Sequence, residues 1–182
     1  MEAISRQVRR KVNQDAFPTG LFTAYVCYYA GQAIYNTYLN LYLYQIGFLA
    51  SQIGAIISVS TVAILAMQPL WGMLSDRVSV KNRVLKFLCL AAAVCAMGFY
   101  TTQSYWPILF LVAMFGVFYN PIVPLSDNIT LEALMKSRWD YGWIRMGGTF
   151  GYAAAVLGIG YFFRDSYEAM FVLIALSLVM TA

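Results

Sequence analysis

Residues 121–152, PIVPLSDNITLEALMKSRWDYGWIRMGGTFGY, decide the fold, because they set an acid and an arginine inside two apolar segments. The polar patch KSRWD at 136–140 separates the two segments and predicts a helix, a tight turn and a second, antiparallel helix. Asp127 and Arg145 lie nine residues before and nine after the centre of that turn. At about 1.5 Å rise per residue both lie roughly 10–14 Å from the tip, so we expect the two side chains to face each other.

An ionisable side chain at such a depth in a membrane costs several kcal/mol unless it is paired or faces water. Residues of this kind mark substrate or ion paths, and the alternative is a structural ion pair that joins two helices. Tyr152 follows Arg145 by seven residues, which is about two turns along the same helix face. Its ring is a candidate platform for a stacked ligand, or else one more aromatic side chain packed between helices.

The composition indicates an integral membrane protein, because 61% of the residues are hydrophobic and only 11% are charged. Six apolar runs predict an all-α fold of six transmembrane helices: 18–43, 53–74, 84–100, 107–134, 141–162 and 169–182. Residues 1–17 form an expected cytoplasmic tail, and 18–182 form the bundle. The sixth run has 14 residues, which reach about 21 Å of a hydrocarbon core roughly 30 Å thick, so we expect a truncated sixth helix.

The distribution of basic residues predicts the orientation in the membrane. Of the 12 Lys and Arg residues, ten fall in the tail, in the loop after the second run and in the loop after the fourth run. Arg164 lies in an opposite loop and Arg145 lies within a run. Because basic loops stay in the cytoplasm, we expect a multi-pass protein of the cell membrane with a cytoplasmic amino terminus. The same clustering between apolar runs argues against nucleic acid as a partner.

Cys27, Cys89 and Cys95 all lie inside apolar runs, and the chain has no histidine. Their spacing does not match a metal site, and no nucleophile is paired with a base. We therefore interpret the cysteines as packing residues and expect no enzyme activity, no cofactor and no metal.

A polar stripe runs along the first predicted helix, with spacings of four, three, four and four residues. Its members are Tyr25, Tyr29, Gln32, Asn36 and Asn40. These spacings place the side chains on one helix face, and lipid offers their amides no hydrogen-bond partner. The stripe is therefore a candidate cavity wall, with Gln32 and Asn36 as candidate substrate contacts. Hydrogen bonding between helices is the alternative.

Two proline residues and one set of small residues shape the fourth and fifth helices. Pro121 and Pro124 each remove a backbone hydrogen bond, so a kink is expected one turn before Asp127. The spacing of Gly147, Gly151 and Ala155 forms a small-residue face that favours close helix contact. Glu132 lies four residues before Lys136, which predicts a surface ion pair without a role in transport.

The segment Gly142-Trp143-Ile144-Arg145-Met146-Gly147-Gly148, followed by Gly151-Tyr152, resembles a stretch that opens helix five in the lactose permease branch of the major facilitator superfamily. This branch holds oligosaccharide:proton symporters and also nucleoside and phenylpropionate permeases. Its members carry a carboxylate on helix four, and Asp127 occupies the matching position, 18 residues before Arg145. The resemblance implies that Asp127, Arg145 and Tyr152 contact substrate.

The segment 68–77, QPLWGMLSDR, resembles the superfamily's loop motif between helices two and three. The resemblance implies a gating role for Gly72, Asp76 and Arg77. Gly72 would let another helix approach closely, and Asp76 could pair with a cation or a helix N-terminus at the membrane edge. Ser79 replaces the glycine that the motif has at this position, so the turn there would be built differently. A basic loop that only fixes topology is the alternative.

Six spans with cytoplasmic ends correspond to the amino-terminal half of a twelve-helix facilitator, whose substrate site lies at the midplane between two halves. The resemblance implies secondary transport of a small polar solute, a sugar or a nucleoside, by proton symport. The bilayer and a carboxy-terminal half or a second copy would be its partners. Two alternatives stay open: a membrane interaction module or non-functional fragment, and transport of an aromatic carboxylate such as phenylpropionate.

Overall fold

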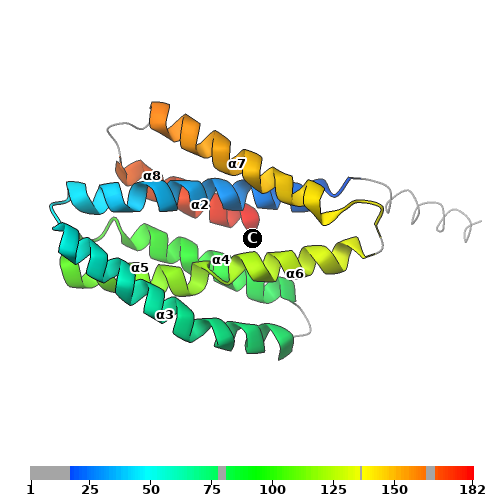
Figure 1. Cartoon of the computed structure of the whole chain (residues 1–182), viewed down its shortest axis with the longest axis horizontal. Helices are drawn as coiled ribbons and strands as arrows, with labels where there is room; N and C mark the ends of the chain where they lie inside the picture. The colour runs from blue at the N-terminus through cyan, green and yellow to red at the C-terminus, as the bar shows by residue number, and fades with distance from the viewer. Residues whose placement is uncertain (1–16, 78–80, 136, 163–166) are drawn as a thin grey trace, which may run out of the picture.

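The computed structural model describes residues 17–77, 81–135, 137–162 and 167–182. Within these ranges the chain forms seven helices and no strand. In chain order they are α2 (Thr19–Gln45), α3 (Ala50–Arg77), α4 (Lys81–Gly98), α5 (Tyr105–Tyr119), α6 (Ile122–Leu134), α7 (Tyr141–Phe162) and α8 (Tyr167–Thr181) (Figure 1). The predicted cytoplasmic tail lies almost wholly outside the described residues.

The predicted fourth span forms two helices, α5 and α6, with a turn at Asn120 and Pro121 between them. Pro121 has no N–H and cannot continue the hydrogen-bond ladder, so the helix breaks there. Hydrogen bonding resumes with the Leu125 N–H, which donates to the Pro121 carbonyl over 3.2 Å. Pro124 lies in the first turn of α6, where a missing N–H costs little. The break therefore falls somewhat earlier than the predicted kink.

Two stretches are long and apolar enough to cross a membrane, Ala50–Leu74 in α3 and Tyr105–Leu134 across α5 and α6. The segment Ala169–Thr181 is apolar but shorter. The other expected spans include polar positions, such as the stripe of α2 and the basic residues at the start of α4. The helical fold is thus confirmed, whereas six membrane crossings stay a prediction.

The helices are arranged in two groups that α4 joins. Helix α2 packs against α7 and α8, while α3 packs against α5. Helix α4 contacts α8 on one side and α5 and α6 on the other (Figure 1). The start of α2, the end of α3, the start of α4, the end of α6 and the start of α7 all lie at one end of the bundle (Figure 1). The described basic residues Arg77, Lys81 and Arg138 lie near these helix ends.

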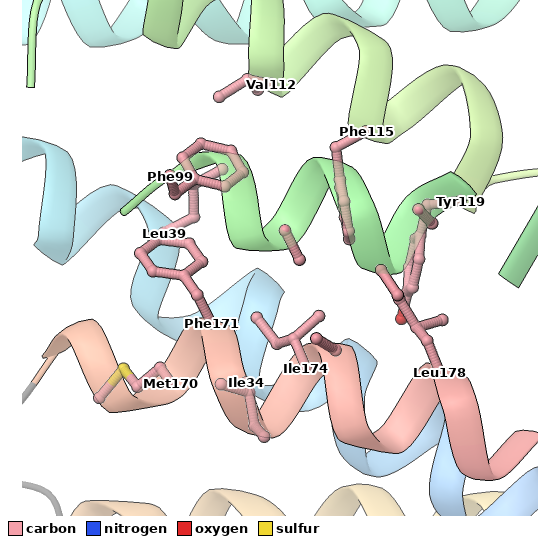
Figure 2. Packing of buried hydrophobic residues seen from close by; sticks show 14 of the residues in the cluster. Ile34, Leu39, Phe99, Val112, Phe115, Tyr119, Met170, Phe171, Ile174 and Leu178 are labelled. Carbon is pink, nitrogen blue, oxygen red and sulfur yellow. The ribbon is translucent and has the colours of Figure 1, made fainter. Parts of the chain in front are cut away.

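The hydrophobic core lies where α2, α4, α5 and α8 meet. Phe99 and Phe171 stack with ring centroids 4.6 Å apart, and Ile174 and Leu178 continue the same face of α8 (Figure 2). Cys89 is fully buried in this core, and its thiol is free. The predicted sixth helix therefore does pack into the bundle, through one apolar face.

Helices α6 and α7 follow each other with a turn between them, as the sequence predicts, but α7 packs mainly along α2. The glycines of α7 allow it to pack closely against α2. A Cβ atom on Gly151 would lie 2.3 Å from the Val26 carbonyl oxygen, and one on Gly148 would lie 2.5 Å from the Tyr29 ring. Of the predicted small-residue face, Gly151 is thus confirmed as a close contact, and so is Gly147, where a Cβ atom would lie 2.7 Å from the Phe22 ring. These contacts set the position of Arg145 relative to α2.

Candidate substrate site

Asp127 of α6 and Arg145 of α7 form an ion pair. The Arg145 Nη1 atom donates to Asp127 Oδ1 over 2.9 Å and to Oδ2 over 3.1 Å. The expectation that these side chains face each other is therefore confirmed. Since one guanidinium nitrogen serves both carboxylate oxygens, the other donors of the planar fork are directed elsewhere.

Tyr25 of α2 completes the polar contacts of the carboxylate. Its hydroxyl donates to Asp127 Oδ1 over 2.6 Å, and Tyr25 itself is only 4% exposed. Charge-assisted hydrogen bonds of this kind are short and about twice as strong as neutral ones. The three side chains join α2, α6 and α7, and Tyr25 fixes the orientation of the carboxylate.

Two tyrosine rings of α2 flank the guanidinium. The Arg145 Cζ atom lies 5.0 Å from the ring centroid of Tyr29 and 6.0 Å from that of Tyr25. The two rings are stacked, 6.2 Å apart at 18°. Tyr141 meets Tyr25 edge-on at 6.5 Å. Rings within about 6 Å of a cation attract it, so the tyrosines hold the arginine beside the acid.

The charged pair is only partly covered by the described chain. The Arg145 side chain is 39% exposed and the Asp127 side chain 26% exposed. Both charges therefore remain accessible on one side, although they are paired with each other. Full enclosure would cost the desolvation of both charges, so partial exposure suits a structural ion pair as well as a binding pair.

Tyr152, the predicted platform for a stacked ligand, is not the ring that flanks Arg145 in the described structure. Tyr152 is half-buried on α7, and in the described part of the chain the rings within cation–π distance of Arg145 are those of Tyr25 and Tyr29. The regular spacing of the α2 stripe could have indicated both tyrosines, but it gives no partner on another helix. A stacking role for Tyr152 stays a prediction about the ligand-bound state.

The rest of the α2 stripe leads away from the charged pair. Gln32 is half-buried, while Asn36 and Asn40 are exposed and line a groove of about 250 Å³ between α2, α3 and α5. The stripe therefore borders the ion pair at one end and a polar groove at the other. This geometry agrees with the predicted cavity wall, and the contact of Gln32 and Asn36 with substrate stays a prediction.

The predicted gating residues lie at the end of α3. Gly72 is exposed and a Cβ atom there would meet nothing within 4 Å, so no described helix approaches it closely. Arg77, the last residue of α3, is exposed. The side chain of Asp76 lies outside the description, and so does Ser79. Gating by these residues stays a prediction.

Glu132 forms an ion pair with a residue of another helix. Lys81 at the start of α4 donates to the Glu132 carboxylate near the end of α6. The predicted partner Lys136 lies outside the described residues. The Lys81–Glu132 contact ties the start of α4 to the end of α6.

Comparison with known proteins places the chain in a family. The family model described as the MFS_1 like family matches residues 19–182. The chain therefore belongs to this family of the major facilitator superfamily, a family of membrane transporters and not of enzymes. The resemblance seen in the sequence is confirmed.

Two of the proteins to which the chain is similar are named as permeases, and a third is named as a transporter. The maltose permease of Geobacillus stearothermophilus is 32% identical over 124 residues, which cover 68% of this chain and 32% of that protein. The uncharacterized transporter YwbF of Bacillus subtilis is 31% identical over 110 residues, covering 60% and 28%. The sucrose permease of Escherichia coli is 25% identical over 141 residues, covering 72% and 34%. The chain thus spans about a third of the length of these relatives, and no solved structure matches it significantly.

Proposed function

We propose that this chain is the amino-terminal half of a secondary transporter for a small neutral saccharide. The observation that carries the proposal is the half-open cluster of Asp127, Arg145, Tyr25 and Tyr29. The similarity to proteins named as maltose and sucrose permeases supports a sugar over other polar solutes.

The cluster suits a sugar in three ways. The Asp127 carboxylate accepts hydrogen bonds from hydroxyl groups, and the donors of Arg145 that do not contact Asp127 bind ligand oxygens. An aromatic ring, Tyr152 in our proposal, stacks against the apolar face of a pyranose. Gln32 and Asn36 add neutral amides, which both donate and accept.

The charge balance of the site distinguishes the substrate classes. Asp127 neutralises Arg145 within hydrogen-bond distance, so a ligand carboxylate would meet no uncompensated cation. An aromatic carboxylate would moreover approach Asp127, and like charges at close range repel each other. A neutral polyol meets neither penalty. We therefore favour a saccharide over phenylpropionate.

A complete transporter needs a second wall. In our proposal a carboxy-terminal half, or a second copy of the chain, faces the open side of the Asp127–Arg145 pair, and the site lies at the interface between the halves. Gly72, Asp76 and Arg77 form the gate between them. Proton symport is part of the proposal and rests on the family resemblance. One wall gives no alternating access, so the chain alone would not drive uptake.

The orientation that we propose has the amino terminus and the loops after α3 and α6 in the cytoplasm of a cell with an energised plasma or inner membrane. The clustering of these loops at one end of the bundle and the Lys81–Glu132 contact support their placement on one side. The excess of basic residues supports the cytoplasmic side.

The proposal is tested with the complete transporter, in which this chain is joined to its carboxy-terminal half, in reconstituted vesicles. Exchange of radiolabelled maltose, uridine and phenylpropionate is measured on the same preparation. We expect exchange of maltose and none of phenylpropionate. Exchange of phenylpropionate alone would refute the charge argument, and exchange of none of the three would favour the interaction module or non-functional fragment.

A further inference from the structure

A second polar surface lies farther along α2 from the charged pair, at Asn36 and Asn40. This groove, of about 250 Å³, separates α2 from α3 and α5. We define the asparagine groove by its polar side chains: Asn36, Asn40, Ser60, Thr61 and Asn120. Its volume falls just under the range of about 300–1,000 Å³ that is usual for small-molecule sites.

Three of the five polar side chains are tied to backbone carbonyls. The Ser60 hydroxyl donates to the Val112 carbonyl over 3.3 Å, and the Thr61 hydroxyl donates to the Ile57 carbonyl over 2.8 Å. The Asn120 Nδ2 atom donates to the Gly116 carbonyl over 3.3 Å. These bonds use the two hydroxyl protons and one N–H of the Asn120 amide, and they leave oxygen lone pairs that can accept from a ligand.

The two remaining amides are exposed. Within the described part of the chain, Asn36 and Asn40 make no side-chain hydrogen bond, and both are exposed in the groove. An amide inside a membrane protein must find water, protein or a polar ligand, because lipid offers it no partner. The side chains that line the groove in the described structure carry no charge. Its chemistry therefore suits a neutral ligand with several hydroxyl groups.

The wall of the groove adds an apolar surface. Tyr35 lines it and is held by Phe115, with ring centroids 4.5 Å apart. A fixed aromatic ring presents a large contact area at little cost in conformational entropy. Amides beside a fixed ring form the kind of surface that binds a pyranose, whose edge is polar and whose face is apolar.

The asparagine groove and the charged pair border the same face of α2. Tyr29 contacts Arg145, and Asn36 follows Tyr29 by seven residues on the same face of α2. Seven residues correspond to about 10 Å along the helix axis. Two linked pyranose rings can span this separation, so one ring at the Asp127–Arg145 pair leaves the next ring at the groove.

We propose that the asparagine groove is a second sugar subsite, which binds the other ring of a substrate with at least two linked pyranose rings. This inference rests on the proposed transport function and deepens it. Ser60, Thr61, Asn40 and Asn120 thereby act as specificity residues, which separate a disaccharide from a monosaccharide.

The test measures the affinity of maltose and of methyl glucoside for the complete transporter by calorimetry. The test variant combines Asn40→Leu and Thr61→Val, which keep side-chain volume nearly constant and remove the polar atoms. Thr37→Val is the matched control, since Thr37 is exposed on α2 and does not line the groove. We expect a loss of at least tenfold in maltose affinity, with methyl glucoside affinity unchanged within twofold.

The outcomes separate this inference from the proposed function. Unchanged affinity for both sugars, or an equal loss for both, would overturn the second subsite and leave the sugar site at Asp127 and Arg145 intact. If the unaltered transporter binds neither sugar, both proposals fall.

A labelling experiment covers the case in which the double variant does not fold. Thr61→Cys is treated with a thiol reagent, and the labelling of the parent chain is subtracted because it has three free cysteines. Maltose is expected to slow the labelling of the new thiol by at least fivefold, and methyl glucoside is not. Equal protection by both sugars, or protection by neither, would contradict the subsite.

Discussion

The substitution Gly151→Ala tests whether the packing of α7 on α2 positions the charged pair. A Cβ atom at this position would lie 2.3 Å from the Val26 carbonyl oxygen and 2.9 Å from the Val26 Cα atom. Ordinary contacts of a Cβ atom begin at 3.4 Å, so the two backbones must separate by about 1 Å. Both contacts are with backbone atoms, and no side-chain rotation can relieve them.

Two opposing effects, helix propensity and overpacking, decide whether Gly151→Ala stabilises or destabilises the protein. Replacing a helical glycine by alanine gains about 0.5–1 kcal/mol of helix propensity. Overpacking a close contact costs about 1–3 kcal/mol. We therefore expect a net loss in stability of about 1–2 kcal/mol, which lowers the apparent Tm by roughly 2–4 °C for each kcal/mol in a chain of this size.

The same displacement should weaken the site. Arg145 of α7 lies 5.0 Å from the ring centroid of Tyr29 on α2, and a movement of α7 by about 1 Å away from α2 brings this distance to the limit of about 6 Å for cation–π attraction. Thermal unfolding of the purified protein and maltose affinity of the complete transporter are measured together. Gly158→Ala is the control, because a Cβ atom there would meet nothing within 4 Å. Equal stability and affinity of Gly151→Ala and Gly158→Ala would refute the reasoning.

Three further changes test separate parts of the structure. Tyr25→Phe removes a hydrogen bond to the charged Asp127. Such a bond is worth about 1.5–3 kcal/mol when buried, and less here because the carboxylate is 26% exposed. Maltose affinity should therefore fall about threefold to tenfold. Tyr119→Phe deletes a buried hydroxyl that has no partner in the described structure, so the Tm should stay equal or rise. For topology, single cysteines at Arg83 and Thr102 are treated with an impermeant thiol reagent on intact cells, and only Thr102→Cys should react.

Each of these three predictions would be contradicted by a specific result. For Tyr25→Phe the control is Tyr44→Phe, at an exposed ring near the end of α2, and equal affinities would show that Tyr25 does not orient the carboxylate. A Tm lowered by several degrees in Tyr119→Phe would reveal a hydrogen bond to water or to the facing half. Labelling of Arg83→Cys without labelling of Thr102→Cys would reverse the proposed orientation.

The sequence predicted the helices and the charged pair because both depend on local patterns. Apolar runs and the polar loops between them fix the approximate limits of the helical stretches, although the fourth run forms two helices, α5 and α6. Equal distance from one turn brings Asp127 and Arg145 to the same depth, whatever the other helices do. The glycine spacing of α7 likewise predicted a close contact.

The sequence could not predict which partners these patterns meet. The small face of α7 could have packed on any helix, and it meets Val26 and Tyr29 of α2. The aromatic partners of Arg145 depend on that packing, which brings the rings of Tyr25 and Tyr29 to the guanidinium. Glu132 was assigned to a neighbour four residues away, but Lys81 of α4 lies close enough to bind it. Contacts between distant residues follow from tertiary packing, which one sequence does not contain.

The central claim is that the Asp127–Arg145 pair binds the sugar and does more than join two helices. The most direct measurement is maltose affinity in the complete transporter for Arg145→Lys and for the exchange of Asp127→Arg with Arg145→Asp. An ammonium keeps the charge but cannot reproduce the planar fork, so Arg145→Lys should lose more than tenfold in affinity, and the exchange should lose binding altogether. Maltose affinity that stays intact in both variants would contradict the binding role and leave only an ion pair between α6 and α7.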